Sequence, residues 1–211
     1  MREQTHASTV QQHESAEQPI APVTLHHLGL KTARFKEMRA FYQTFLGCRP
    51  VLEIEGKVGF YTFDLAHHRL ALFEDPSCTQ AIPTSAGMHH LAFLHACVDD
   101  LMRVYQRLKR QGIFPRFGMD HGPNTSLYYQ DPDGNLMELL IDNFGADAGK
   151  GLEFFSQFQS NPSLHGKPIN PETYLAAWQQ GATLAELHEQ SFAGGFAEGA
   201  ASIPQGPFSR Q

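Results

Sequence analysis

The sequence predicts an α+β fold made of two paired βαβββ modules that form one open barrel-like sheet, followed by a helical C-terminal extension. The main observation is an internal repeat: a shift of 63 residues places residues 25–47 on residues 88–110. Each copy begins with a short apolar strand and continues with apolar residues at helical spacing. Each copy then ends in apolar runs around turns, which is typical of hairpins. Such a module cannot cover its own sheet, so we expect the two copies to pair and enclose one site.

The position of the histidines is the second observation. Six of the twelve histidines form the adjacent pairs His26–His27, His67–His68 and His89–His90. The first and third pairs open the two copies of the repeat. Because side chains alternate along a strand, one face of the first copy carries His27 and Gly29. The same face of the second copy carries His90 and Ala92, so we predict that both imidazoles face the shared site, with small residues beside them.

An acidic residue interrupts the last apolar strand of the second copy. Glu138 lies between Met137 and Leu139, and a carboxylate buried in such a strand needs a partner. Two imidazoles and one carboxylate from different strands make a facial triad that leaves coordination positions open on a first-row metal. Fe(II) is the leading candidate. The competing interpretations are hydrogen-bonded core histidines and a solvated glutamate at a sheet edge.

Composition narrows the function classes. The net charge is −6 without a cluster of Lys and Arg, which argues against nucleic acid because that binding depends on basic patches. The chain has no apolar run of the roughly 20 residues that a membrane span needs, and no secretion signal. Its three cysteines form no CxxC, which argues against a disulfide framework or a thiolate zinc site. We therefore expect a cytoplasmic protein with no membrane partner.

The domain organisation follows from the repeat and from the tails. The expected parts are a disordered tail at 1–20, a domain at 21–145 with modules 23–80 and 87–145, a helical extension at 146–192 and a flexible tail at 193–211. Within the extension, Asn170 before Pro171 predicts the start of one helix. Thr183 and Glu186 predict a capping box for the next.

Four stretches together carry a family resemblance: "LHHLGL...FYQTFLG", "DLAHHRLALF", "GMHHLAF" and "DHGPNTSLYYQDPDGNLMELL". The sequence resembles the vicinal oxygen chelate superfamily and, within it, the single-domain type I extradiol ring-cleaving dioxygenases. The first and third stretches are typical of the whole superfamily. The fourth is more specific to the ring-cleaving branch.

The resemblance implies roles for individual residues. It implies that His27, His90 and Glu138 hold Fe(II), with Mn(II) as the alternative metal. Tyr128 matches a tyrosine that hydrogen-bonds the metal-bound substrate oxygen, and His121 matches a histidine near the substrate. His68 matches the histidine that acts as acid and base on the activated ring.

The choice between His67 and His68 stays open in the sequence. If Ala71 faces the site as the repeat implies, simple alternation favours His67, which would then be a substrate-binding residue. Both histidines lie where a turn meets a strand, and an irregular residue there can reverse the facing. The resemblance favours His68 as the catalytic residue.

Other functions of the same fold remain as alternatives. A glyoxalase-like isomerase typically uses a second acidic ligand from the first module, but a shift of 67 residues sets Ala71 against Glu138. A manganese-dependent antibiotic-modifying transferase could use the same three ligands. A non-catalytic module that binds a drug or an aromatic ligand is the alternative outside enzymes.

The expected reaction defines the partners. The resemblance implies a catechol-type aromatic diol and O2 as substrates, with opening of the ring next to the diol. It also implies a homodimer or a higher homo-oligomer.

Overall fold

The structure is a computed structural model that describes residues 20–80, 82, 84, 86–145, 147–158, 160–161, 164 and 166–201. The N-terminal tail predicted at 1–20 therefore lies outside the described residues except for Ile20. The tail predicted at 193–211 is described only as far as residue 201.

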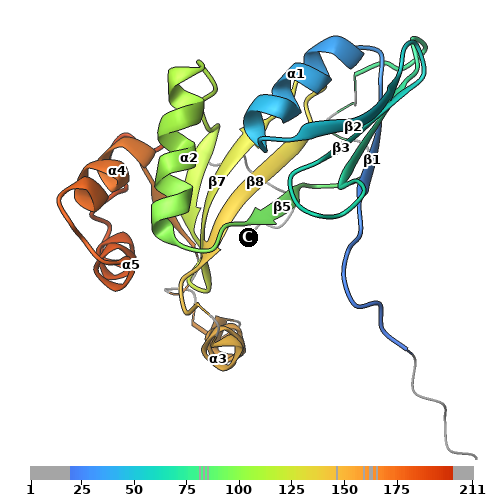
Figure 1. Ribbon diagram of the computed structural model, residues 1–211. Helices are drawn as coiled ribbons and strands as arrows, with labels where there is room; N and C mark the ends of the chain where they lie inside the picture. Colours follow the sequence, from blue (N-terminus) through green and yellow to red (C-terminus); the bar gives the residue numbers. More distant parts are fainter. Residues whose placement is uncertain are drawn as a thin grey trace, which may run out of the picture.

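The elements follow the predicted order of two βαβββ modules (Figure 1). Module 1 contains β1 (Leu28–Thr32), α1 (Phe35–Phe45), β2 (Arg49–Ile54), β3 (Val58–Thr62) and β4 (Leu70–Glu74). Module 2 contains β5 (Leu91–Leu94), α2 (Val98–Arg110), β6 (Phe117–Asp120), β7 (Asn124–Gln130) and β8 (Leu136–Asp142). The C-terminal extension contains α3 (Ala148–Phe158), β9 (Lys167–Ile169), α4 (Pro171–Gln179) and α5 (Leu184–Phe192).

The α+β class is confirmed, and the strands of the described residues form two mixed sheets that are not closed. The first sheet has the order β1-β4-β3-β2, and the second has the order β5-β8-β7-β6-β9. In each module the first strand runs parallel to the last, and the remaining pairs are antiparallel. The first strand of each module therefore lies beside the last strand of the same module.

The two faces of β1 and β5 differ as the alternation predicts. Leu28, Leu30, Leu91 and Phe93 pack against the buried core. Gly29 and Ala92 lie on the opposite, exposed face. Gly29 and Ala92, which alternate with the core residues after His27 and His90, therefore lie on the face turned away from the core under α1 and α2.

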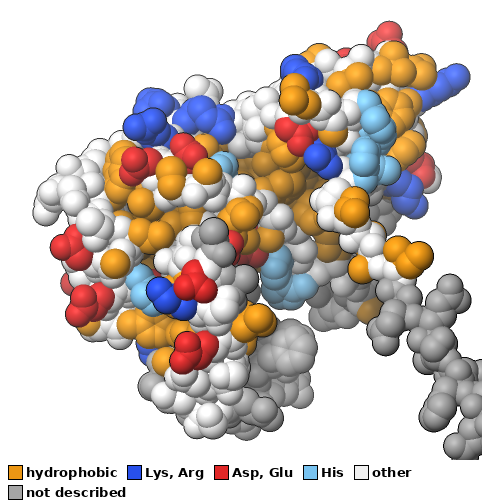
Figure 2. Space-filling view, turned by 60° about the horizontal axis from the view of Figure 1, so that its bottom comes forward, with side chains coloured by type: hydrophobic (Ala, Val, Ile, Leu, Met, Phe, Trp, Pro, Cys, Tyr) orange, Lys and Arg blue, Asp and Glu red, His pale blue; other side chains and the backbone are white. Residues whose placement is uncertain are grey.

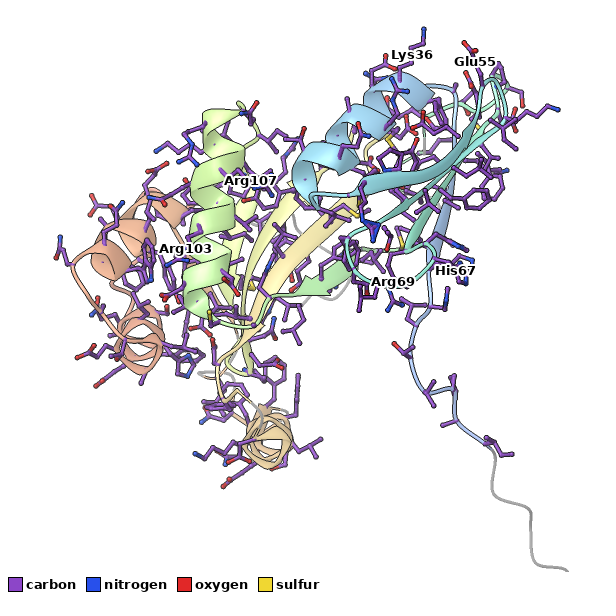
Figure 3. All side chains as sticks on the ribbon, viewed as in Figure 1. Lys36, Glu55, His67, Arg69, Arg103 and Arg107 are labelled. Carbon is purple, nitrogen blue, oxygen red and sulfur yellow. The ribbon has the colours of Figure 1, made fainter. Side chains whose placement is uncertain are left out.

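One core lies between the helices and joins the two modules. The Tyr42 hydroxyl of α1 donates a hydrogen bond of 2.9 Å to Asp131, which follows β7. The rings of Phe45 and Tyr129 are 5.2 Å apart. Arg107 of α2 reaches α1 (Figure 3), where its guanidinium donates to the carbonyls of Thr44 and Phe45. The Tyr42–Asp131 bond is buried and the Arg107 bonds are partly buried, and together they hold one module against the other through the helix side of both sheets.

The extension covers one edge of the second sheet. The short strand β9, which sequence analysis did not predict, pairs with β6. A Cβ at Gly118 would lie 2.8 Å from Ile169, so glycine permits this close approach. The predicted caps are confirmed: Asn170 accepts from the Glu172 backbone, and Thr183 and Glu186 form a capping box. Among the described residues, no helix is long and apolar enough to cross a membrane.

The extension is also tied to the sheet by a buried carboxylate. Asp120 at the end of β6 is 0% exposed. One of its oxygens accepts from the Gly122 backbone and from Asn143, and the other lies 2.8 Å from Nδ1 of His188 in α5. The α5 helix therefore satisfies a charge that the domain buries.

We predict that His188→Ala destabilises the protein by about 1–3 kcal/mol, because the buried Asp120 oxygen loses its partner in α5. Urea denaturation measures the free energy of unfolding. The exposed neighbour Glu189→Ala is the matched control and should change it by less than about 0.5 kcal/mol. Equal values for the two variants would contradict the assigned role of the Asp120–His188 contact.

Candidate functional site

Module 2 brings its candidate ligands into direct contact. Register pairs Glu138 of β8 with Ala92 on one side and with Tyr128 on the other. His90, which precedes β5, places Nε2 3.0 Å from Oε2 of Glu138. The Glu138 residue is only 3% exposed. A buried carboxylate therefore faces an imidazole at the open side of the second sheet.

Two residues that sequence analysis missed orient this carboxylate. Ser126 donates a hydrogen bond of 2.5 Å to Oε1 of Glu138, and Asn124 donates to the same oxygen at 3.4 Å. Both lie on β7 and alternate with Tyr128, so all three share a face. This alternation along "NTSLY" was the available signal. The oxygen that faces His90 is left on the open side of the carboxylate.

His121 and Tyr128 form the second contact of this half. His121 Nε2 lies 2.8 Å from the Tyr128 hydroxyl, and Phe117 stacks on the Tyr128 ring at 4.4 Å between centroids. Burial, followed by the Glu138 charge, raises the pKa of Tyr128 above its usual value. Burial lowers the pKa of His121. Near neutral pH the pair is therefore an uncharged imidazole and an uncharged phenol.

Aromatic residues of α3 form one wall of a pocket beside His90 and Glu138 in module 2. A pocket of about 390 Å³ is lined by His90, His121, Asn124, Tyr128, Glu138, Leu140, Asp142, Phe155 and Phe158. The helix sits close because Gly122 has a φ of +98°, and a Cβ there would lie 2.0 Å from the Phe154 ring. Only glycine fits both constraints. The pocket therefore combines a polar floor with an aromatic wall.

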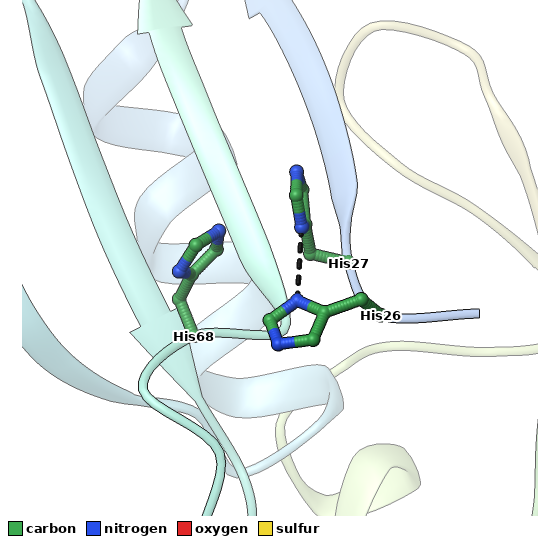
Figure 4. Close-up of side chains that lie close together, drawn as sticks. All are labelled: His26, His27 and His68. Atoms are coloured by element: carbon green, nitrogen blue, oxygen red, sulfur yellow. Dashed lines mark hydrogen bonds between the residues drawn. The ribbon is translucent and has the colours of Figure 1, made fainter. Parts of the chain in front are cut away.

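Module 1 gathers a different set of imidazoles (Figure 4). Nδ1 of His26 lies 3.0 Å from Nδ1 of His27. The ring of His68 is centred 4.4 Å from that of His27 and 5.5 Å from that of His26. His67 adjoins His68, with 2.6 Å between their Nδ1 atoms. Two of the three adjacent histidine pairs are thus side by side at one end of the first sheet.

Strand alternation does not apply to His67 and His68. Strand β4 starts only at Leu70, so His67 and His68 belong to the irregular segment before it. Burial, then the neighbouring His27, lowers the pKa of His68. Figure 3 shows His67 and Arg69 at the same end of module 1. His68 lies beside His27 and His67 lies beside His26, so the choice between His67 and His68 stays a prediction.

Within one chain, His27 and Ala92 line one pocket, but His27 is not grouped with His90 and Glu138. In the part of the chain that the structure describes, the only three potential metal ligands whose donor atoms lie within 4.8 Å of one another are His26, His27 and His68. His27 does not join His90 and Glu138 in such a group. Figure 2 likewise shows histidines gathered in separate places on one face of the molecule. The assignment of His27, His90 and Glu138 to one metal therefore stays a prediction.

Comparison with known proteins agrees with this architecture. The family model of the glyoxalase/bleomycin resistance protein/dioxygenase superfamily matches residues 24–139. The chain is 42% identical over 144 residues to biphenyl-2,3-diol 1,2-dioxygenase 2 of Rhodococcus globerulus, covering 68% of this chain and 73% of that protein. It is 35% identical over 171 residues to biphenyl-2,3-diol 1,2-dioxygenase 3 of the same organism, covering 80% and 89%.

A crystal structure of a glyoxalase/dioxygenase from Nostoc punctiforme is 25% identical and has a TM-score of 0.46, covering 61% of this chain and 99% of that one. The family model covers more than half of the chain, and both modules fall within the matched range. The chain belongs to the glyoxalase/bleomycin resistance protein/dioxygenase superfamily.

Proposed function

We propose that this protein is an extradiol dioxygenase that opens an aromatic diol next to its two hydroxyl groups. The observation that carries the proposal is the contact between His90 and the buried Glu138, with Tyr128 and His121 beside it. The two Rhodococcus globerulus relatives, named biphenyl-2,3-diol dioxygenases, support the same reaction class.

The donor set of this half suits a divalent metal. Glu138 is buried, and its described partners are Ser126, Asn124, the Tyr128 hydroxyl and the imidazole of His90. A buried carboxylate among such donors gains from a cation bound at the oxygen that faces His90. We assign His90 and Glu138 as two ligands of Fe(II), with Mn(II) as the alternative. When bound, the metal would bring diol and O2 together and stabilise developing negative charge.

The third ligand, His27, lies in module 1, and its donor atoms are not grouped with those of His90 and Glu138. Buried contacts such as Tyr42–Asp131 hold the two modules of one chain against each other. Large apolar side chains are exposed on module 1 and on β5, among them Phe63, Phe73 and Leu94. We therefore propose a homodimer in which His27 and His68 of one copy face His90 and Glu138 of the other.

We assign His121 and Tyr128 to the positioning of the substrate and His68 to proton transfer. His121 Nε2 and Glu138 both contact the Tyr128 hydroxyl, which positions the phenol to form a hydrogen bond with a substrate oxygen. A neutral His68 can take a proton from the diol and return it, because an imidazole titrates near the working pH. Gly29, Ala92 and His67 are assigned to the wall around the diol.

The pocket favours a diol that carries an apolar substituent. Phe155 and Phe158 of α3 line the wall beyond His90 and Glu138. Aromatic rings bind a second ring by stacking or edge contacts as well as by burial. We therefore expect bicyclic diols to be preferred over unsubstituted catechol.

We predict that the protein, reconstituted with Fe(II) under anaerobic conditions, consumes O2 and forms a yellow product with a bicyclic catechol. Glu138→Gln should lower the rate by roughly 100-fold or more, because the metal loses an anionic ligand. The matched control is Glu74→Gln, the same change on β4 of module 1, which should leave the rate unchanged. Oxygen uptake with mono- and bicyclic diols is the measurement.

Two outcomes would reject the proposal. Bound iron without turnover of any diol would favour the transferase or the isomerase. Failure of iron or manganese to approach one ion per chain would favour a non-catalytic binding module.

We predict that two inactive variants restore activity when mixed. In the proposed dimer, a chain with His27→Ala and a chain with Glu138→Gln share one intact site of two. After unfolding and refolding together, about one quarter of the wild-type activity should return, because half of the dimers are mixed. Each variant refolded separately is the control. Activity that stays at the level of the separate variants would show that each site belongs to one chain.

We predict that the metal-free protein loses stability as the pH falls below about 6.5, partly through His121. In the unfolded chain, His121 binds a proton as the pH falls through about 6.5. In the folded chain, burial lowers the pKa of His121, so the folded protein takes up this proton only at lower pH. The loss in the free energy of unfolding therefore begins below the pKa of the unfolded chain and is complete below the pKa of the folded chain. Urea midpoints between pH 7.5 and 5 should fall less in His121→Gln than in the wild type. Parallel curves would contradict this prediction.

A further inference from the structure

His26 has no role in the proposed reaction, although it lies within the group of imidazoles in module 1. Its Nδ1 is 3.0 Å from Nδ1 of His27, and the donor atoms of His26, His27 and His68 lie within 4.8 Å of one another. In Figure 4 the three rings surround one space, and His68 comes from a different segment than the other two.

The backbone around these imidazoles is held in place. The Arg69 guanidinium donates to the carbonyl of His26 at 2.8 Å and to Asp64 at 2.9 Å. The Arg69 carbonyl accepts from the Leu28 backbone at 3.0 Å. The chain on both sides of His27 is thus bonded to the residue that follows His68. This brings the two histidine-bearing segments together before any ligand binds.

The chemistry of the donor set differs from that of the proposed iron site. It consists of three imidazoles without a carboxylate, since Asp64 is paired with Arg69. Imidazole nitrogens suit Zn²⁺, Ni²⁺ and Cu²⁺, which bind such ligands more tightly than Fe²⁺. Zinc–nitrogen bonds of about 2.0–2.1 Å in a tetrahedron place two ligand nitrogens roughly 3.3 Å apart, close to the His26–His27 separation. A small inward movement of His68 would complete three ligands and leave a fourth position for water.

We propose that His26, His27 and His68 form a second metal site, which takes a borderline divalent ion such as Zn²⁺ and does not need His90 or Glu138. His27 and His68 are shared with the proposed dioxygenase site, so the two sites exclude each other. An ion held by module 1 would keep both histidines from the diol. The role of His26 is to make this competing site possible.

The test uses the full chain with His90→Gln and Glu138→Gln, which removes the proposed iron ligands of module 2. Titration with Co²⁺, a spectroscopic substitute for Zn²⁺, should give the visible bands of a tetrahedral ion with one equivalent bound. Zn²⁺ should then displace the Co²⁺. Adding His26→Ala should weaken Co²⁺ binding at least ~10-fold.

The repeat supplies a matched control, because His89 is the counterpart of His26 in module 2. His89→Ala in the same background should leave Co²⁺ binding unchanged. Absence of stoichiometric binding in the His90→Gln, Glu138→Gln chain would overturn the proposal, as would equal affinities for the His26→Ala and His89→Ala chains. His26→Gln should weaken Co²⁺ binding as His26→Ala does. An unchanged circular dichroism spectrum of His26→Gln would show that the weaker binding comes from loss of the imidazole and not from misfolding. Failure here would not affect the diol test, which depends on Glu138.

Discussion

The buried hydrogen bond between Tyr42 and Asp131 belongs to the core on which the rest of the structure depends. Together with the Phe45–Tyr129 contact and the Arg107 bonds, it joins α1 to module 2. Burial raises the pKa of the Asp131 carboxyl, and the Tyr42 hydroxyl and Asn135 oppose that shift. This core uses the α1 and α2 side of both sheets, whereas His90, Glu138 and Tyr128 lie on the other face of the second sheet, in the pocket that α3 lines.

Glu138 shows how an apolar strand can carry a charge. Ser126 and Asn124 hold one of its oxygens from the neighbouring strand, while the other faces His90. The same strand pair sets Tyr128 beside it, and His121 then contacts Tyr128 from the end of β6. Asp120, the residue before His121, is tied to α5 through His188. The C-terminal extension is thus connected to the site through Asp120, the last residue of β6, and the adjacent His121.

The sequence predicted the modules and the facing of β1 and β5, because a repeat and strand alternation are local properties. It also predicted the capped helices of the extension. It did not predict β9, a strand of three residues that includes a proline, because the pairing of β9 with β6 depends on contacts between distant segments. The grouping of His27 with His90 and Glu138 stays a prediction. The shift of 67 residues that sets Ala71 against Glu138 also sets Tyr61 against Tyr128. In the structure, however, Ala71 pairs with Phe60 and Glu138 pairs with Tyr128, because the connection between the two strands is one residue longer in module 1.

The outer strand β2 limits how a second molecule can attach to module 1. All six of its residues are exposed, and its pairing with β3 is irregular between Pro50 and Leu52. A proline without an N–H and a local bend both discourage the addition of another strand along that edge. Growth of the first sheet into an extended ladder is therefore disfavoured at β2. The other edge of this sheet is β1, which pairs only with β4 among the described strands, so strand addition to module 1 is directed to the edge that carries the histidine pair.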